Sequence, residues 1–172
     1  AYVPGGVEPI PNLYQAEKDV PKNTSNGCFQ EYEGQRVQPC IYGNPNGSKT
    51  IAVVGSSHAE QYVDVLADIA KKHDVKLLTY TKGGCNITTE PHPKTLDGKD
   101  YPGCRQWMDT VLAEVKQLKP DFVFTNNTRT GGYGGKDSVP ETYLSGARIL
   151  LDAGIPVLGM RDNPWLMTPD GG

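Results

Sequence analysis

Apolar residues along this chain follow two patterns that alternate from residue 50 onward. Short apolar runs, which are typical of buried strands, occupy 50–55, 75–80, 121–125 and 155–160. Apolar residues recur at helical spacing over 59–72, 107–118 and 140–153. For the last of these helices, Ser138 is a candidate cap and Gly154 a candidate stop. Strands that alternate with helices predict an α/β sandwich around a parallel sheet.

Residues 1–48 show neither pattern. They contain six prolines and repeated glycine and asparagine. We therefore expect an irregular N-terminal extension that wraps the core, followed by an α/β domain over 49–172. Two further stretches, 82–103 and 128–138, are expected to be loops because they are rich in glycine or proline.

Length and charge narrow the functional class. A chain of 172 residues fits one domain with one core. Its 17 basic and 20 acidic side chains give a formal charge of -3. A nucleic-acid partner would need a clustered basic face, so we expect none. No apolar run approaches the roughly 20 residues that span a bilayer, and no signal-peptide pattern is present. If the protein is exported, we expect its signal or anchor to lie outside these residues.

Four cysteines, Cys28, Cys40, Cys85 and Cys104, allow three pairings. Pairing in sequential order would close two short loops, each worth about 3 kcal/mol in the loop-entropy account. Each cysteine lies near turn residues, where a structural disulfide fits. We expect two disulfides and an oxidising compartment; the alternative is four reduced thiols in a cytosolic protein. With no Cys-x-x-Cys pair and only three histidines, we expect no metal site.

Polar residues that follow the strands are the candidates for a site, because parallel sheets bind ligands beyond the carboxyl ends of their strands. These segments are Gly55-Ser-Ser-His58, Lys82-Gly-Gly-Cys85, Asn126-Asn-Thr-Arg129 and Arg161-Asp-Asn-Pro164. Ser57 lies where a strand turns into a helix, which suits a nucleophile whose attack creates an oxyanion. The alternative is that Ser56 or Ser57 only caps the helix. Nucleotide binding is disfavoured, since the turn has neither a Walker lysine nor a dinucleotide glycine pattern.

The block Gly55-Ser-Ser-His-Ala59 resembles the Gly-Asp-Ser-His block of SGNH/GDSL hydrolases. The flanking blocks are Cys28…Pro-Cys-Ile-Tyr-Gly43, Thr81-Lys-Gly-Gly-Cys85, Cys104-x-x-Trp107 and Lys119-Pro-Asp121. Together they are similar to the SGNH domain fused to the membrane-embedded acyltransferase family 3 (AT3) proteins of bacteria. Those enzymes O-acylate cell-surface glycans, glycolipids or peptidoglycan. The resemblance runs from about Cys28 to Pro164.

The resemblance implies a three-layer α/β/α SGNH (flavodoxin-like) fold with a central parallel sheet. It implies that Ser57 takes the acyl group and that no cofactor is needed. The oxyanion hole would consist of the Ser57 N–H, Gly84 and Asn127, with Asn126 as the alternate; both asparagines could instead serve turn chemistry. The expected disulfides are Cys28–Cys40, which would staple the N-terminal extension, and Cys85–Cys104.

This sequence departs from the family pattern at two places. The family's Asp before the nucleophile is Ser56 here. The family's catalytic Asp-x-x-His follows the last strand, but residues 159–172 contain no histidine. A serine without a base is a poor nucleophile, so we expect the α/β domain to be C-terminally incomplete.

The remaining polar residues near the strand ends are given lesser roles. We expect His58 to be a structural residue of the first helical turn and His73 to be solvated. His92 lies in a proline-rich loop that could approach a pocket. Asp162 and Asp170 could hold a base, although Asp162 suits the turn before Pro164. Arg129 and Tyr133 could bind the acyl donor or the glycan. The default interpretation is that they belong to a solvated loop.

We therefore expect an extracytoplasmic O-acyltransferase domain that passes a short acyl group through an acyl-serine to a glycan or glycolipid hydroxyl, or a carbohydrate esterase variant. Its expected partner is an AT3 membrane domain in the same or a neighbouring chain. Its expected place is the periplasm or outer face of a bacterial membrane, tethered through an N-terminal region outside this sequence. The alternative is a non-catalytic module that binds glycan or a partner. A cytosolic flavodoxin-like or receiver-like domain is disfavoured, because the first strand does not end in an acidic cluster.

Overall fold

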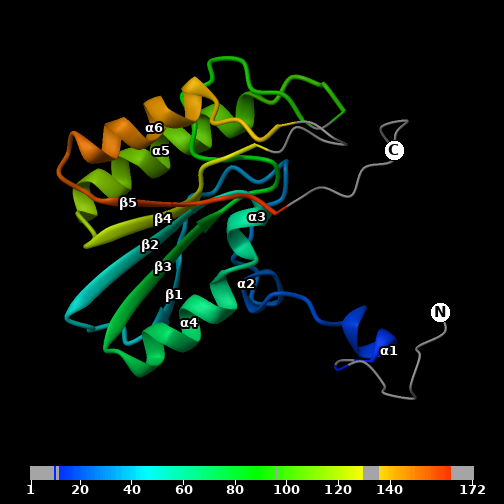
Figure 1. Cartoon of the computed structure of the whole chain (residues 1–172), viewed down its shortest axis with the longest axis vertical. Coiled ribbons are helices and arrows are strands. Elements are labelled where there is room, and N and C mark those ends of the chain that lie inside the picture. Colours follow the sequence, from blue (N-terminus) through cyan, green and yellow to red (C-terminus); the bar gives the residue numbers. More distant parts are fainter. Residues whose placement is uncertain (1–9, 11, 96, 130–135, 164–172) are drawn as a thin grey trace.

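The computed structural model describes residues 10, 12–95, 97–129 and 136–163. Five strands form one sheet in the order β1-β3-β2-β4-β5. Their bounds are β1 Cys40–Gly43, β2 Lys49–Gly55, β3 Val75–Thr81, β4 Phe122–Asn126 and β5 Val157–Met160. The helices are α1 Leu13–Ala16, α2 Lys22–Ser25, α3 Ser57–Glu60, α4 Val63–Lys72, α5 Pro102–Leu118 and α6 Glu141–Leu151. Helices lie on both faces of the sheet, with α5 and α6 on one face and α4 on the other (Figure 1).

The four strands predicted from apolar runs are all present, and they pair in parallel. Successive side chains of a strand point to opposite faces. In β2, Ile51 and Val53 therefore pack toward α4, whereas Ala52 and Val54 pack toward α5. Because both faces are covered by helices, no position of the strand needs to be polar, which explains the continuous apolar runs. The α/β/α sandwich with a parallel core is confirmed.

Strand β1 was not predicted, because its residues fall in the stretch that the sequence indicated to be irregular. It pairs antiparallel with β3, with Cys40 opposite Thr79 and Gly43 opposite Lys76. It has only four residues, half of them exposed, and it follows Pro39. A short, half-exposed edge strand carries little apolar signal.

The helix expected over 59–72 is divided into α3 and α4 by a turn at Gln61 and Tyr62. The Tyr62 ring lies against Phe124 of β4, with ring centroids 5.2 Å apart. Because Tyr62 is partly buried against the same core cluster as Val63 and Ala67, the helical spacing of apolar residues continues through the break and conceals it.

Ser138 is not the cap of α6. The N-cap position belongs to Pro140, which makes no side-chain cap bond. The backbone of Ser138 is instead paired with Arg129 in both directions, at 2.8 and 2.9 Å. Beyond the other end of the helix, Gly154 has a φ of 78° and donates its N–H to Leu151.

Two disulfides join the cysteines in sequential order. Cys28–Cys40 ties the segment after α2 to β1, and Cys85–Cys104 ties the loop after β3 to the first turn of α5. Within the described ranges, none of the helices has the length and hydropathy needed to cross a bilayer.

Candidate active site

A cleft of about 430 Å³ opens at the carboxyl ends of the parallel strands. Each strand-end segment named from the sequence contributes to its wall. The contributors are Ser56 to His58 after β2, Gly84 after β3, Thr128 and Arg129 after β4, and Asp162 after β5. The topological rule that selected these segments therefore located the cleft.

The two adjacent serines have different roles. Ser56 is 4% exposed and occupies the N-cap of α3, where its Oγ accepts the His58 N–H at 3.3 Å. Ser57, the first residue of α3, is exposed and lines the cleft. The capping interpretation thus applies to Ser56 and leaves the Ser57 hydroxyl accessible. Because α3 has only four residues, its dipole adds little to the field at Ser57.

Two residues that line the cleft, Ser57 and Gly84, carry backbone donors left unused by the described residues. The N–H groups of Ser57 and Gly84 make no hydrogen bond within the described part of the chain. Gly84 has a φ of 61°, a conformation that glycine adopts without strain. The N–H of Lys82 donates to the carbonyl of Gly55 at 3.0 Å, which holds the end of β3 against the end of β2. Unused N–H groups beside a serine are what an oxyanion hole requires.

Lys82 is fully buried, which the sequence did not indicate. Its ammonium donates to the carbonyls of Glu31, at 2.8 Å, of Tyr32, at 2.9 Å, and of Gly34. Burial lowers the pKa of Lys82. The ammonium thereby fixes the turn over 31–34 and seats the Tyr32 ring beside Gly84, where Tyr32 lines the cleft.

His58 and Asp162 meet in the cleft although 104 positions separate them. His58 Nδ1 lies 2.5 Å from Asp162 Oδ1. Asp162 also accepts the N–H of Asn163 at 3.0 Å, in agreement with a turn role, and its own N–H donates to Thr128 Oγ1 at 2.8 Å. The sequence analysis gave the two residues unrelated roles, because no local sequence pattern indicates that they are in contact.

The asparagines predicted as oxyanion donors do not line the cleft. Asn126 is 1% exposed, with Nδ2 3.5 Å from Asp162 Oδ1. Asn127 packs against β5, because a Cβ on Gly159 would lie 2.8 Å from the Asn127 Cβ. Their catalytic role stays a prediction. Asn86, which the sequence analysis did not consider, does line the cleft.

The loop closed by the Cys85–Cys104 disulfide forms another wall of the cleft, through Glu90, His92 and Lys94. His92, which the sequence placed in a loop that could approach a pocket, therefore does line the cleft. Two other candidates, Tyr133 and Asp170, lie outside the described residues. Among the residues that the structure does describe, no three His, Cys, Asp or Glu side chains gather in a group that could hold a metal.

Comparison with known families gives one finding. A family model described as the SGNH domain (fused to AT3 domains) matches residues 27–170. No curated protein and no solved structure gives a significant match.

Proposed function

Because the chain belongs to the family of SGNH domains fused to AT3 domains, we propose that it transfers a short acyl group through Ser57 to a hydroxyl of a cell-envelope glycan or glycolipid. Family membership makes it a hydrolase-like or acyltransferase-like module. The choice of Ser57, the acyl-serine and the acceptor are our proposal. The observation that carries it is an exposed serine sharing one cleft with two unused backbone N–H groups.

The proposed chemistry has two steps. In the first, Ser57 Oγ attacks the carbonyl carbon of an acyl donor and loses its proton to a base. The carbonyl oxygen becomes an oxyanion held by the N–H groups of Ser57 and Gly84, and the donor's leaving group departs with a proton. In the second, a sugar hydroxyl attacks the acyl-serine and restores the Ser57 hydroxyl. Attack by water instead gives the esterase variant.

The proposed setting follows from the disulfides and the family. Two disulfides fit an oxidising compartment. The family description supplies the partner, an AT3 membrane domain, which would deliver the acyl group. We therefore place the domain in the periplasm or on the outer face of a bacterial membrane, tethered through an N-terminal region. Within the chain we propose that 49–172 forms the SGNH-like unit and that 1–48 is its stapled extension.

The test is acylation of the chain by p-nitrophenyl acetate, followed by intact mass and by nitrophenol release. Ser57→Ala should abolish the acetyl adduct and lower turnover by at least about 10³-fold while leaving the thermal midpoint unchanged. Ser56→Ala is the matched control. It should keep the adduct but lose about 1 kcal/mol of stability, since it removes the N-cap.

A glycan acceptor then separates the two variants of the proposal. Acetylated sugar among the products indicates a transferase, and acetate alone indicates an esterase. If the wild type and Ser57→Ala behave alike, with no adduct on either, the acyl-serine proposal is wrong. Glycan binding that survives Ser57→Ala would then favour the non-catalytic binding module.

A further inference from the structure

A third asparagine, far in the sequence from the two predicted as oxyanion donors, contacts a tyrosine on the cleft wall. Asn86 follows the Cys85 disulfide, and Tyr143 lies in the first turn of α6. Asn86 Nδ2 lies 2.8 Å from the Tyr143 hydroxyl oxygen, and both residues line the cleft with Ser57. A Cβ on Gly55 would be 4.0 Å from Asn86 Oδ1, so the amide lies over the end of β2, two residues before Ser57.

The pair holds more donor hydrogens than it uses. With Asn86 Nδ2 donating to Tyr143, the Oδ1 of Asn86 is buried without a partner within the described residues, and the phenol hydrogen is not used. Turning the amide by half a rotation lets the phenol donate to Oδ1 and leaves the NH₂ group unused. The second arrangement, however, places the NH₂ group at the buried Oδ1 position, so each arrangement leaves one buried amide atom without a partner among the described residues. With Nδ2 donating, the unused hydrogen is that of the Tyr143 phenol, and Tyr143 lines the cleft. In both arrangements, at least one donor hydrogen of the pair is unused.

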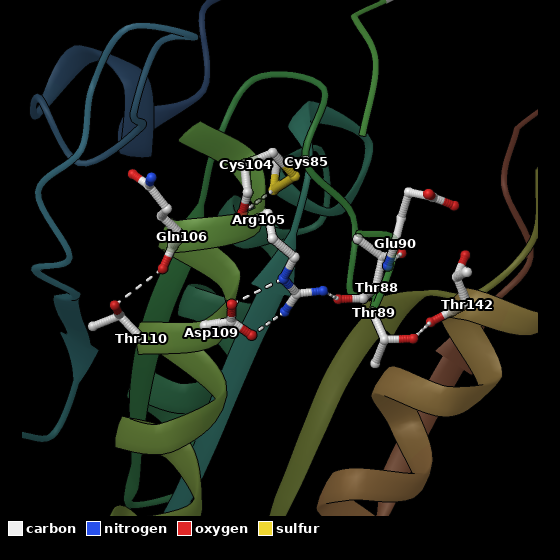
Figure 2. Close-up of polar contacts among 10 residues, drawn as sticks. All are labelled: Cys85, Thr88, Thr89, Glu90, Cys104, Arg105, Gln106, Asp109, Thr110 and Thr142. Atoms are coloured by element: carbon white, nitrogen blue, oxygen red, sulfur yellow. Dashed lines mark hydrogen bonds and ion pairs between the residues drawn. A yellow bond between two sulfur atoms is a disulfide. The ribbon is translucent and has the colours of Figure 1, made fainter. Parts of the chain in front are cut away.

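The loop that carries Asn86 is fixed from both sides (Figure 2). Toward α5, the Cys85–Cys104 disulfide closes it, and Arg105 donates to the Thr88 carbonyl at 2.7 Å while pairing with Asp109. Toward α6, the Thr89 N–H donates to the Thr142 carbonyl at 2.9 Å. A donor held in this way needs no reorganisation when charge develops, which is the condition for strong transition-state stabilisation.

The helix α6 approaches the same loop closely at Gly146. A Cβ there would lie 3.1 Å from the backbone nitrogen of Thr88. Backbone and helix are thus in contact three residues after Tyr143, which limits movement of the tyrosine relative to Asn86. Burial raises the pKa of Tyr143, so its phenol stays protonated and can donate at neutral pH.

We propose that the Asn86–Tyr143 pair supplies the side-chain donor of the oxyanion hole, beside the N–H groups of Ser57 and Gly84. The pair donates a hydrogen bond to the oxyanion and transfers no proton. This inference rests on the proposed acyl-serine chemistry, and it replaces the role predicted for Asn127.

The test compares Asn86→Ala, Tyr143→Phe and the double variant with the wild type, using p-nitrophenyl acetate. Loss of one oxyanion donor should lower kcat by about 10²–10³-fold and leave KM unchanged. The double variant should lose less than the product of the two single losses, because the pair acts as a unit. Asn26→Ala is the matched control. Asn26 Nδ2 donates to the Tyr42 hydroxyl over 3.2 Å, and neither residue lines the cleft. This variant should keep the wild-type kcat.

The outcomes distinguish failure of this inference from failure of the proposed acyl-serine chemistry at Ser57. If Ser57→Ala abolishes turnover but Asn86→Ala and Tyr143→Phe keep the wild-type kcat, the inference is overturned and the acyl-serine proposal stands. A loss of kcat that appears in Asn127→Ala instead has the same meaning. Equal losses of kcat and of folded protein in Asn86→Ala would assign it a merely structural role and overturn the inference. If the wild type itself forms no acyl-serine, both proposals fall.

Discussion

Replacing Lys82 with methionine tests how the cleft is held together. Methionine keeps an unbranched apolar stem but removes the ammonium. Three backbone carbonyls, those of Glu31, Tyr32 and Gly34, then lose their common donor. The substitution also removes the cation that lies 5.4 Å from the centre of the Tyr101 ring. The change is therefore confined to one buried group that ties the N-terminal turn to the end of β3.

The expected cost follows from the number of carbonyls. A buried polar group without a partner costs about 1–3 kcal/mol. The turn over 31–34 is only partly buried, so the lower end applies, and three carbonyls sum to about 3 kcal/mol. Relief from burying the ammonium, whose cost is visible in the lowered pKa of Lys82, reduces the net loss to about 2 kcal/mol. For a chain of this size that loss lowers the thermal midpoint by about 4–8 °C.

The assay is thermal unfolding of Lys82→Met beside Lys49→Met. Lys49 is the matched control, because its ammonium meets the Asp121 carboxylate in solvent, at 2.8 Å, rather than carbonyls in the interior. Exposed ion pairs contribute little, so the control should unfold close to the wild type. If Lys82→Met is as stable as Lys49→Met, the three carbonyl contacts do not hold the turn and this account of the cleft wall is wrong.

Two more predictions concern the same region and the core. Gly84→Ala should be less stable than Gly98→Ala: both glycines have positive φ, but a Cβ on Gly84 would lie 2.7 Å from the Tyr32 hydroxyl, whereas Gly98 has open space. Equal melting temperatures of the two variants would show that the Tyr32 side chain moves aside without a cost in stability. Burial raises the pKa of Tyr80 and Tyr101 above the usual value of about 10. The folded state then keeps protons that the unfolded chain releases, so stability should fall as pH rises above about 10, and the tyrosinate absorbance contributed by Tyr80 and Tyr101 should appear only on unfolding.

The parallel strands were predictable because their environment leaves a direct trace in the sequence. A strand covered on both faces, such as β2, is apolar on both faces along its buried part, here Ile51 to Val54, and polar residues follow where it ends. The break between α3 and α4 left no such trace, since Tyr62 continues the apolar spacing across it. Strand β1 was missed for the opposite reason: it is short, half exposed and paired with a partner far along the chain.

The sequence predicted residues of the candidate site only where they directly follow the carboxyl end of a parallel strand. Ser57 and Gly84 met that condition. The contact between His58 and Asp162 joins residues 104 positions apart, and no local pattern could indicate it. Asn86 lies in a loop, and its place in the cleft wall, in contact with Tyr143 of α6, follows from the packing of that loop against α6. Long-range contacts of this kind are set by packing, which a single sequence does not display.

Lys82 shows how stability and cleft shape depend on the same contact. A lysine is almost never fully buried without partners. Its burial is tolerated only because the turn over 31–34 supplies carbonyl acceptors. Those acceptors belong to the segment that places Tyr32 against Gly84. The segment before residue 49 therefore contributes to the cleft wall as well as wrapping the core. Loss of the Lys82 contacts should lower the melting temperature and also change the shape of the cleft around Gly84.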